Sequence, residues 1–166
     1  MNNFDKILIG THNKGKFKEI SDLLPENLKK ISPFSLNIES PIENGKTFTE
    51  NSEIKANYFC AKSKLVTLSD DSGLVIDCLK GEPGIYSARW ADKYGSFDNA
   101  MTEILDRVKK INESTSAQFV CSLTIQWPNG KKISEIGIIE GNISSKKGKN
   151  GFGYDPIFIP EKYKIT

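Results

Sequence analysis

The sequence predicts an α/β fold built on a mixed sheet, and two observations carry this prediction. Through the first half of the chain, apolar strand-like segments alternate with helical patterns, as in parallel strands joined by crossover helices. Later in the chain, two strand-like segments are separated only by residues 128–131, a turn sequence typical of an antiparallel hairpin. Because no repeat, low-complexity tract or linker interrupts this order, we expect a single domain over residues 1–166.

The first third of the chain predicts a strand, a helix and a short second strand. Residues 6–10 form an apolar strand, and apolar side chains at helical spacing follow over residues 14–24. Pro25 ends that helix because a proline cannot continue it. Residues 30–34 are a plausible short strand.

The middle of the chain predicts a second helix followed by two strands. Thr47 and Glu50 fit a capping box, which opens a helix that ends near Lys64. Residues 67–70 and 74–79 then form two apolar strands with a Ser-Gly break between them. We therefore expect the chain to turn at this break.

The last third predicts a long helix and the hairpin. Asp98 caps a helix whose apolar stripe is expected to be core and comprises Met101, Ile104, Leu105, Val108 and Ile111. Residues 118–127 alternate between apolar and polar side chains, the period of a half-buried strand, with only Val120 out of step. Residues 132–140 return as its partner strand.

Composition excludes several classes of partner and mechanism. With 23 Lys and Arg against 21 Asp and Glu, the net charge of +2 gives no reason to expect a nucleic-acid or membrane partner. Cys60, Cys78 and Cys121 are widely spaced, so we expect reduced thiols rather than a disulfide framework or a zinc site. No signal region or spanning segment is present, which predicts a soluble, cytoplasmic protein.

The remaining candidates for chemistry are few. His12 is the only histidine, which argues against Ser-His-Asp or Cys-His catalysis. The glycines of residues 148–153 precede an apolar strand rather than a helix, so they form neither a dinucleotide fingerprint nor a Walker loop.

Three segments point to nucleotide chemistry instead. Residues 68–74 place Asp70, Asp71 and Ser72 at an expected strand end, which favours metal or water chemistry, although a solvated turn is the alternative. Residues 6–16 run from a strand into a small-residue turn and a helix start with two lysines, an arrangement that attracts phosphate. Residues 148–156 carry two aromatics and a carboxylate in a glycine-rich loop, suitable for holding a nucleobase.

Together with residues 43–48, 50–56 and 83–89, these segments resemble the inosine/xanthosine triphosphate pyrophosphatase family, in the family's order from Ile7 to Pro160. The resemblance implies an elongated mixed sheet with helices forming two lobes around a central cleft. It also implies a homodimer, Mg²⁺ as cofactor, and a purine nucleoside triphosphate as substrate. The activity implied is hydrolysis of the deaminated forms ITP, dITP and XTP to the monophosphate and pyrophosphate.

The resemblance also assigns residues to the reaction centre. Asp71 is expected to be the general base and a metal ligand, with Asp70 as a supporting carboxylate. Glu43 is the second expected Mg²⁺ ligand, although Asn44 stands where the family more often has Thr. A solvated loop acid is the alternative interpretation of Glu43.

Substrate-binding residues follow from the same resemblance. Lys16 and Lys55 are expected to contact phosphate, Phe152 to stack on the purine, and Ser72 to contact substrate. The complete expected set for phosphate and base is Thr11, His12, Asn13, Lys14, Gly15, Lys16, Lys55, Ser72, Phe152, Gly153, Tyr154 and Asp155. Lys14 could equally be an exposed lysine, and Phe152 and Tyr154 could be core aromatics.

Two other functions stay open at this point. One is a related house-cleaning phosphohydrolase that acts on modified pyrimidine nucleotides. The other is a nucleotide-binding but catalytically impaired chain, because the family continues into a lysine and a Ser-His-Arg motif whereas this sequence ends at Thr166. On that basis we expect a domain truncated at its C-terminal end, with little activity and poor base discrimination.

Overall fold

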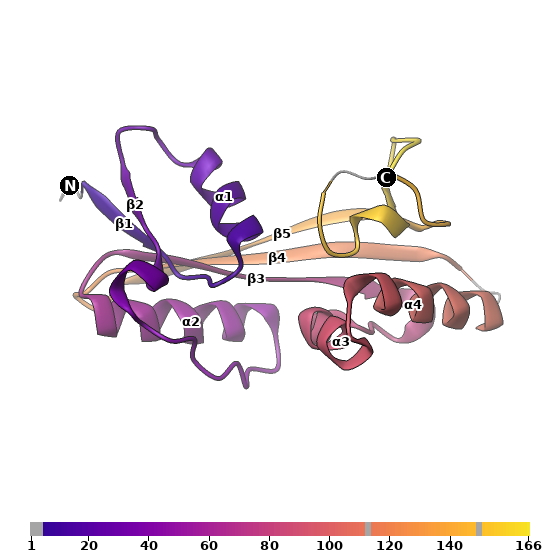
Figure 1. The fold of residues 1–166 in the computed structure, drawn as a ribbon, viewed down its shortest axis with the longest axis horizontal. Coiled ribbons are helices and arrows are strands. Elements are labelled where there is room, and N and C mark those ends of the chain that lie inside the picture. Colours follow the sequence, from indigo (N-terminus) through magenta and orange to yellow (C-terminus); the bar gives the residue numbers. More distant parts are fainter. Residues whose placement is uncertain (1–4, 112–113, 149–150) are drawn as a thin grey trace. The chain divides into compact units, whose positions relative to one another are not determined.

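The computed structural model describes residues 5–111, 114–148 and 151–166. In these residues the chain forms helices and strands in a mixed α/β order (Figure 1). The strands are β1 (Lys6–Ile9), β2 (Lys29–Ile31), β3 (Thr67–Ile76), β4 (Ser116–Gln126), β5 (Lys132–Ile143) and β6 (Phe158–Pro160). The α-helices are α1 (Lys14–Leu23), α2 (Phe48–Ser63), α3 (Ser87–Tyr94) and α4 (Phe97–Ile111).

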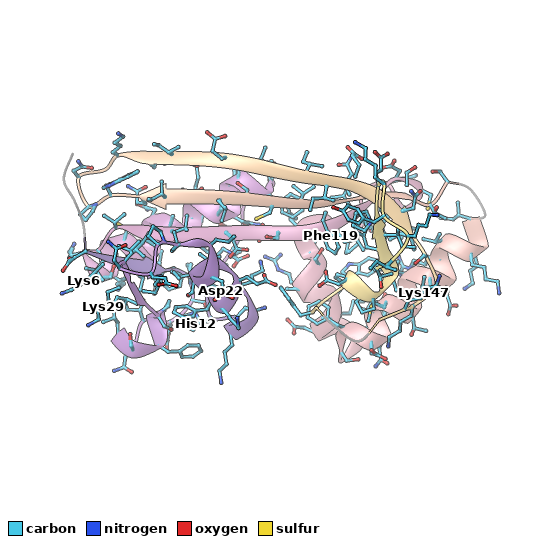
Figure 2. The ribbon with its side chains drawn as sticks, turned by 90° about the horizontal axis from the view of Figure 1, so that it is seen from above. Lys6, His12, Asp22, Lys29, Phe119 and Lys147 are labelled. Carbon is cyan, nitrogen blue, oxygen red and sulfur yellow. The ribbon has the colours of Figure 1, made fainter. Side chains whose placement is uncertain are left out.

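The strands form one mixed sheet in the order β2-β1-β3-β4-β5-β6. β1 pairs in parallel with both β2 and β3, whereas β5 and β6 are antiparallel. Lys6 of β1 is in register with Lys29 of β2, and Figure 2 shows these two lysines close together. The mixed α/β prediction is therefore confirmed.

The chain divides into two compact units, which are described separately. Unit 1 comprises Met1–Asp71 and Ser122–Ile136, and unit 2 comprises Ser72–Cys121 and Gly137–Thr166. Unit 1 contains α1 and α2, and unit 2 contains α3 and α4, which lie side by side (Figure 1).

The expected turn between residues 70 and 74 is wrong. β3 runs without a break from Thr67 to Ile76, so Asp70 and Asp71 lie in the middle of a strand and are only 3% and 6% exposed. Asp, Ser and Gly form turns when water satisfies their polar groups, but here other parts of the chain supply the partners for the carboxylates. The continuous strand also excludes the alternative interpretation of this segment as a solvated turn.

Smaller differences occur at other element ends. The strand expected over residues 30–34 is β2 at Lys29–Ile31, because Ser32 accepts a hydrogen bond from Phe34 N and starts the short 3-10 helix Pro33–Leu36. Asp98 does not cap α4. The helix begins one residue earlier, where Ser96 Oγ accepts from Asn99 N at 3.1 Å.

The capping signal of α2 is confirmed in part. Thr47 Oγ1 accepts from Glu50 N at 3.1 Å, as in a capping box. The Glu50 carboxylate, however, accepts from Lys46 N rather than from Thr47 N. The start of α2 therefore also fixes the preceding loop.

One apolar core cluster lies in unit 2, and unit 1 also buries apolar residues, among them Leu8, Ile9 and Phe59. Met101, Ile104 and Val108 of α4 are buried in the unit 2 cluster, as the stripe predicts, whereas Ile111 at the helix end is 39% exposed. Cys60, Cys78 and Cys121 form no disulfide with one another, and Cys60 is buried. No helix in residues 5–111, 114–148 and 151–166 is long and apolar enough to cross a membrane.

β4 confirms the period of a half-buried strand, but its buried side is the polar one. Ser122, Thr124 and Gln126 are buried, whereas the apolar residues between them are partly exposed. Ser52 of α2 explains this inversion, because its Oγ lies 3.1 Å from Ser122 Oγ and 2.8 Å from Thr124 Oγ1. Hydroxyls that satisfy one another can be buried at little cost.

Candidate active site

Two adjacent carboxylates in the middle of β3 organise the site in unit 1. Successive side chains of a strand point to opposite faces, so Asp70 and Asp71 reach different helices. Asp70 meets α1 and Asp71 meets α2, which lie on opposite sides of β3 in Figure 1. The two aspartates thus make different ion pairs, although the charge of Lys16 also acts on Asp71.

Asp70 forms an ion pair with Lys16. The distance from Lys16 Nζ to Asp70 Oδ2 is 2.5 Å, and the side chains are 20% and 4% exposed. Since Lys16 lies in the first turn of α1, this pair fixes the start of the helix against the sheet. A buried carboxylate of this kind requires such a partner.

Asp71 is held by two side chains of α2. Asn51 Nδ2 donates to Asp71 Oδ2 at 3.1 Å, and Lys55 Nζ lies 3.6 Å from Asp71 Oδ1. The same Lys55 ammonium lies 3.1 Å from Glu43 Oε1. Residues 43, 51, 55 and 71 therefore form one connected group of two carboxylates, an amide and an ammonium.

This environment adjusts the protonation of Asp71. Burial raises the pKa of Asp71 above its ordinary value, and the Lys55 ammonium and the Asn51 amide oppose this rise only in part. The Glu43 carboxylate adds to it. A carboxylate with a raised pKa is a stronger base once ionised, which suits the removal of a proton from water.

The loop between β1 and α1 is held mostly by its own side chains. Asn13 caps α1, because its Oδ1 accepts from Gly15 N at 2.8 Å and from Lys16 N at 3.2 Å. Thr11 is buried and accepts from Asn13 N at 3.2 Å, whereas Lys14 is exposed. An incoming anion would have to compete with Asn13 for these helix-start amides.

The His12 ring packs in unit 1. Its Nδ1 lies 2.6 Å from Ser40 Oγ, and its centroid lies 4.6 Å from Phe34 and 5.8 Å from Phe59 (Figure 2). These contacts occupy the ring with neighbours in the fold. His12 therefore shapes the loop through packing rather than presenting a free imidazole.

The donor set for a metal ion is limited. Within the described parts of the chain, no three His, Cys, Asp or Glu side chains gather closely enough to hold a metal by themselves. Glu43 and Asp71, the expected ligands, both lie near the Lys55 ammonium, at 3.1 Å and 3.6 Å. Mg²⁺ commonly takes one or two protein carboxylates and fills its other positions with water and phosphate oxygens. Two carboxylates that share one cation fit that requirement.

The expected base-binding loop lies in unit 2. Gly153 has a positive φ of 66°, and Asp155 Oδ2 accepts from Phe152 N at 2.9 Å, which closes the loop. Burial raises the pKa of Asp155. Phe152 is 36% exposed and could present a ring face to a ligand, whereas Lys149 and Asn150 of the same segment lie outside the described residues.

Tyr154 is part of the core of unit 2 rather than an open aromatic face. It is 3% exposed, its hydroxyl donates to Ser87 O at 2.8 Å, and its ring packs edge-on against Phe97 at 5.2 Å. For this residue the structure supports the core interpretation. Ser72, the last expected contact, is a half-buried residue of β3 in unit 2.

An apolar cavity borders the same loop. It has a volume of about 350 Å³ and lies entirely within unit 2. Its lining comprises Phe119, Ile139, Gly151, Asp155, Phe158, Pro160 and Thr166.

Sequence reasoning missed Asn51 as a site residue. Asn51 is 0% exposed and contacts both Asp71 and the backbone of Gly45. A helical position that follows an N-cap at the start of α2 is usually solvated, so its burial was not visible in the local pattern. The available signal was its place within residues 50–56, one of the segments that carry the family resemblance.

Comparison with known proteins finds relatives of this chain by sequence. The sequence model of the Ham1 family matches residues 7–166. The dITP/XTP pyrophosphatase of Zymomonas mobilis is 40% identical over 163 residues, which cover 96% of this chain and 78% of that protein. The dITP/XTP pyrophosphatase of Agrobacterium fabrum is 43% identical over 169 residues, covering 96% and 79%.

Solved structures give the same result. A HAM1 protein from Coxiella burnetii matches with a TM-score of 0.85 at 33% identity, covering 93% of this chain and 81% of that one. A nucleoside-triphosphatase, dITP/XTP pyrophosphatase, from Mycobacterium abscessus matches with a TM-score of 0.80 at 33% identity, covering 97% and 86%.

Proposed function

The chain belongs to the Ham1 family, and on this premise we propose that it hydrolyses deaminated purine nucleoside triphosphates to the monophosphate and pyrophosphate. ITP, dITP and XTP are the proposed substrates, in keeping with the names of its relatives. The observation that carries the proposal is the state of Asp71, a buried carboxylate with a raised pKa next to a lysine and a second carboxylate. Such a group is suited to activating water next to bound phosphates.

In the proposed reaction, Asp71 takes a proton from a water molecule while the oxygen of that water attacks the α-phosphorus. A new P–O bond forms there, the bond from the α-phosphorus to the bridging oxygen breaks, and pyrophosphate leaves with the electron pair. Phosphoryl transfer of this kind depends mainly on positioning and on neutralising charge. Asp71 contributes to positioning, because its contacts with α2 hold it in place.

Lys16 and Lys55 supply positive charge. Each ammonium is already paired with a carboxylate of β3, at 2.5 Å and 3.6 Å respectively. These pairs hold the two lysines in place before any substrate arrives, so less side-chain entropy is lost on binding. We propose that both ammonium groups contact the triphosphate.

Mg²⁺ is part of the proposal, with Glu43 and Asp71 as the carboxylates that would hold it. A bound divalent ion would supply additional neutralisation of the phosphate charge. The proposal is supported by the Lys55 ammonium, which lies near both carboxylates and marks a location of negative charge.

The proposed roles of Phe152 and Gly153 in base binding are predictions from the resemblance. Stacking tolerates any base, so preference for a 6-oxo purine must come from hydrogen bonds. A homodimer and a cytoplasmic location are predictions of the same origin.

The test is pyrophosphate release from a panel of ITP, dITP, XTP, ATP, GTP and dTTP, with and without Mg²⁺. We expect pyrophosphate from the first three, and the rate with ATP measures the base discrimination. EDTA should abolish turnover and Mg²⁺ should restore it. Release of inorganic phosphate instead of pyrophosphate would contradict the proposal, and preferential turnover of dTTP would favour a pyrimidine phosphohydrolase.

Asp71→Asn is the matched variant for this assay, since it preserves the side-chain volume. We expect kcat to fall by about 10²- to 10⁴-fold, the usual contribution of a general base. Nucleotide binding measured on the same sample should persist. Binding without turnover in the wild-type chain would indicate a nucleotide-binding protein rather than an enzyme.

A further inference from the structure

Asn51 lies at the start of α2 with its side chain fully buried, next to the proposed base of the reaction. We propose that Asn51 is a positioning residue that holds Asp71 and the Glu43 loop in a fixed arrangement through a single side-chain amide. The inference rests on the proposed function, because it assigns a role within that reaction.

The two hydrogen bonds of Asn51 run in opposite directions. Its Nδ2 donates to Asp71 Oδ2 at 3.1 Å, and its Oδ1 accepts from Gly45 N at 2.8 Å. The ionised carboxylate can only accept and the backbone N–H can only donate, so both contacts are satisfied in just one orientation of the amide. Aspartate lacks the donor, and alanine lacks both groups.

The first bond determines which oxygen of Asp71 is left for chemistry. Asn51 occupies Oδ2, while Oδ1 is the oxygen that faces Lys55. Rotation of the carboxylate would break the bond to Asn51 and expose an unsatisfied amide in a buried place, which costs about 1–3 kcal/mol. Asn51 therefore keeps Oδ1 as the oxygen that receives the proton of water.

The second bond positions the loop that carries Glu43. Gly45 is two residues after Glu43, and its backbone passes so close to α2 that an added Cβ would lie 2.7 Å from Asn51 Oδ1 and 2.9 Å from Asn51 N. Only glycine permits this approach without displacing the loop. The separation of Glu43 and Asp71, which meet at Lys55, thus depends on one amide.

Ser52, the next residue, provides a matched control. It is also fully buried, and its hydroxyl bonds to Ser122 and Thr124 of β4 rather than to a site carboxylate. Truncation at either position removes buried hydrogen bonds from the same turn of α2. A purely structural role for Asn51 would make the two variants behave alike.

The experiment compares Asn51→Ala with Ser52→Ala in the pyrophosphate-release assay, using ITP with Mg²⁺, together with thermal unfolding. We expect both variants to lose stability, but only Asn51→Ala to lose kcat, by about 10- to 100-fold as for other residues that orient a reactive group. KM should change by less than about threefold, because the phosphate contacts are retained. Equal kcat values for the two variants would overturn the inference.

A double-mutant cycle tests whether Asn51 acts through Asp71. In an Asp71→Asn background, adding Asn51→Ala should lower kcat by at most about twofold, because the group it positions is already lost. A full additional loss would show that Asn51 acts independently, which also overturns the inference.

Two further arms keep the outcome clear. If Asn51→Ala does not fold, Asn51→Asp preserves the side-chain volume and the acceptor for Gly45 N, replaces the donor to Asp71 with a carboxylate that repels it, and should lose at least as much kcat. A wild-type chain that releases no pyrophosphate from any triphosphate refutes the proposed function, and the role of Asn51 with it. An active wild type whose Asn51 variants match Ser52→Ala refutes only the positioning role.

Discussion

The interiors of the two units differ in how many polar side chains they bury. Unit 1 buries apolar residues such as Leu8, Ile9 and Phe59, but it also buries many polar and charged side chains, namely Thr11, Asn51, Ser52, Thr67, Ser69, Asp70, Asp71, Ser122, Thr124 and Gln126. The interior of unit 2 is an apolar cluster that includes Leu74, Ile76, Trp90, Met101, Ile104, Ile157 and Phe158. Because burying a polar group costs free energy unless it is hydrogen-bonded, these groups need partners, and Asp70 and Asp71 have theirs in Lys16, Asn51 and Lys55.

The polar interior of unit 1 is arranged in partnered groups. The hydroxyl of Ser52 forms hydrogen bonds with those of Ser122 and Thr124. A further hydrogen bond of 2.9 Å joins Thr124 Oγ1 to Ser134 Oγ. Burying these groups adds little net stability, but it holds α2 in one position. Unit 2 gains stability from apolar area instead. Variants in the two units should therefore separate stability from activity.

The largest expected effect on stability is in unit 2. Ile104 of α4 is 0% exposed within the apolar cluster, so Ile104→Ala leaves a cavity and should lower the free energy of unfolding by about 2–5 kcal/mol. At a temperature where the variant is folded, kcat should stay within about twofold of wild type. Chemical denaturation with a parallel turnover assay measures both. A large kcat loss in fully folded protein would remove the distinction between the units.

Lys16→Ala should lower both stability and activity. It leaves the buried Asp70 carboxylate without its 2.5 Å partner, which should cost about 1–3 kcal/mol of stability. It should also raise KM and lower kcat, with weaker binding of triphosphate than of monophosphate. Lys18→Ala, at an exposed position of the same helix where the side chain pairs only with exposed Asp22, is the control and should change neither. Equal weakening for both ligands would show that Lys16 does not contact the leaving phosphates.

The smallest expected effect is a gain in stability from Asp71→Asn. Burial raises the pKa of Asp71, so the folded state favours the neutral carboxyl. Asp71 therefore stabilises the fold only below its unfolded-state pKa, ordinarily 3.8, and this contribution is lost as the pH rises through the folded-state pKa. At pH 7 the variant should be more stable by about 1 kcal/mol, which raises Tm by about 2–4 °C.

A Tm measurement at acidic pH is the control for this gain in stability. Below pH 3.8 both proteins carry a neutral group at position 71, so the difference in Tm should vanish. A variant that is less stable than wild type at pH 7 would mean that the contacts with Asn51 and Lys55 outweigh burial, and Asp71 would then stabilise the polar interior.

The local sequence predicted the elements whose signals are local. Asn13 and Pro25 lie at the two ends of α1, Thr47 starts α2, and residues 128–131 close the β4–β5 hairpin. Each of these depends on hydrogen bonds or steric limits among residues a few positions apart. The stripe of α4 belongs to the same class, because its 3.6-residue period marks the buried face directly.

The local sequence failed at the candidate site itself. Asp-Asp-Ser-Gly predicts a turn, and the structure has a continuous strand. A buried carboxylate is tolerated only with partners, and those partners are Lys16, Asn51 and Lys55, which lie 54, 20 and 16 positions away along the chain. No window of sequence around Asp70 contains that information.

The sequence by itself determined the α/β class, the N-cap of α2, the hairpin and, through the combination of its motifs, the family. Only the tertiary structure decided that Asp70 and Asp71 point to different helices, that Asn51 is buried against Asp71, and that Tyr154 belongs to a core. The physical reason is the distance along the chain between the groups that interact. Caps and turns are settled by neighbouring backbone groups, whereas burial and the pairing of charges depend on segments that meet only when the chain has folded.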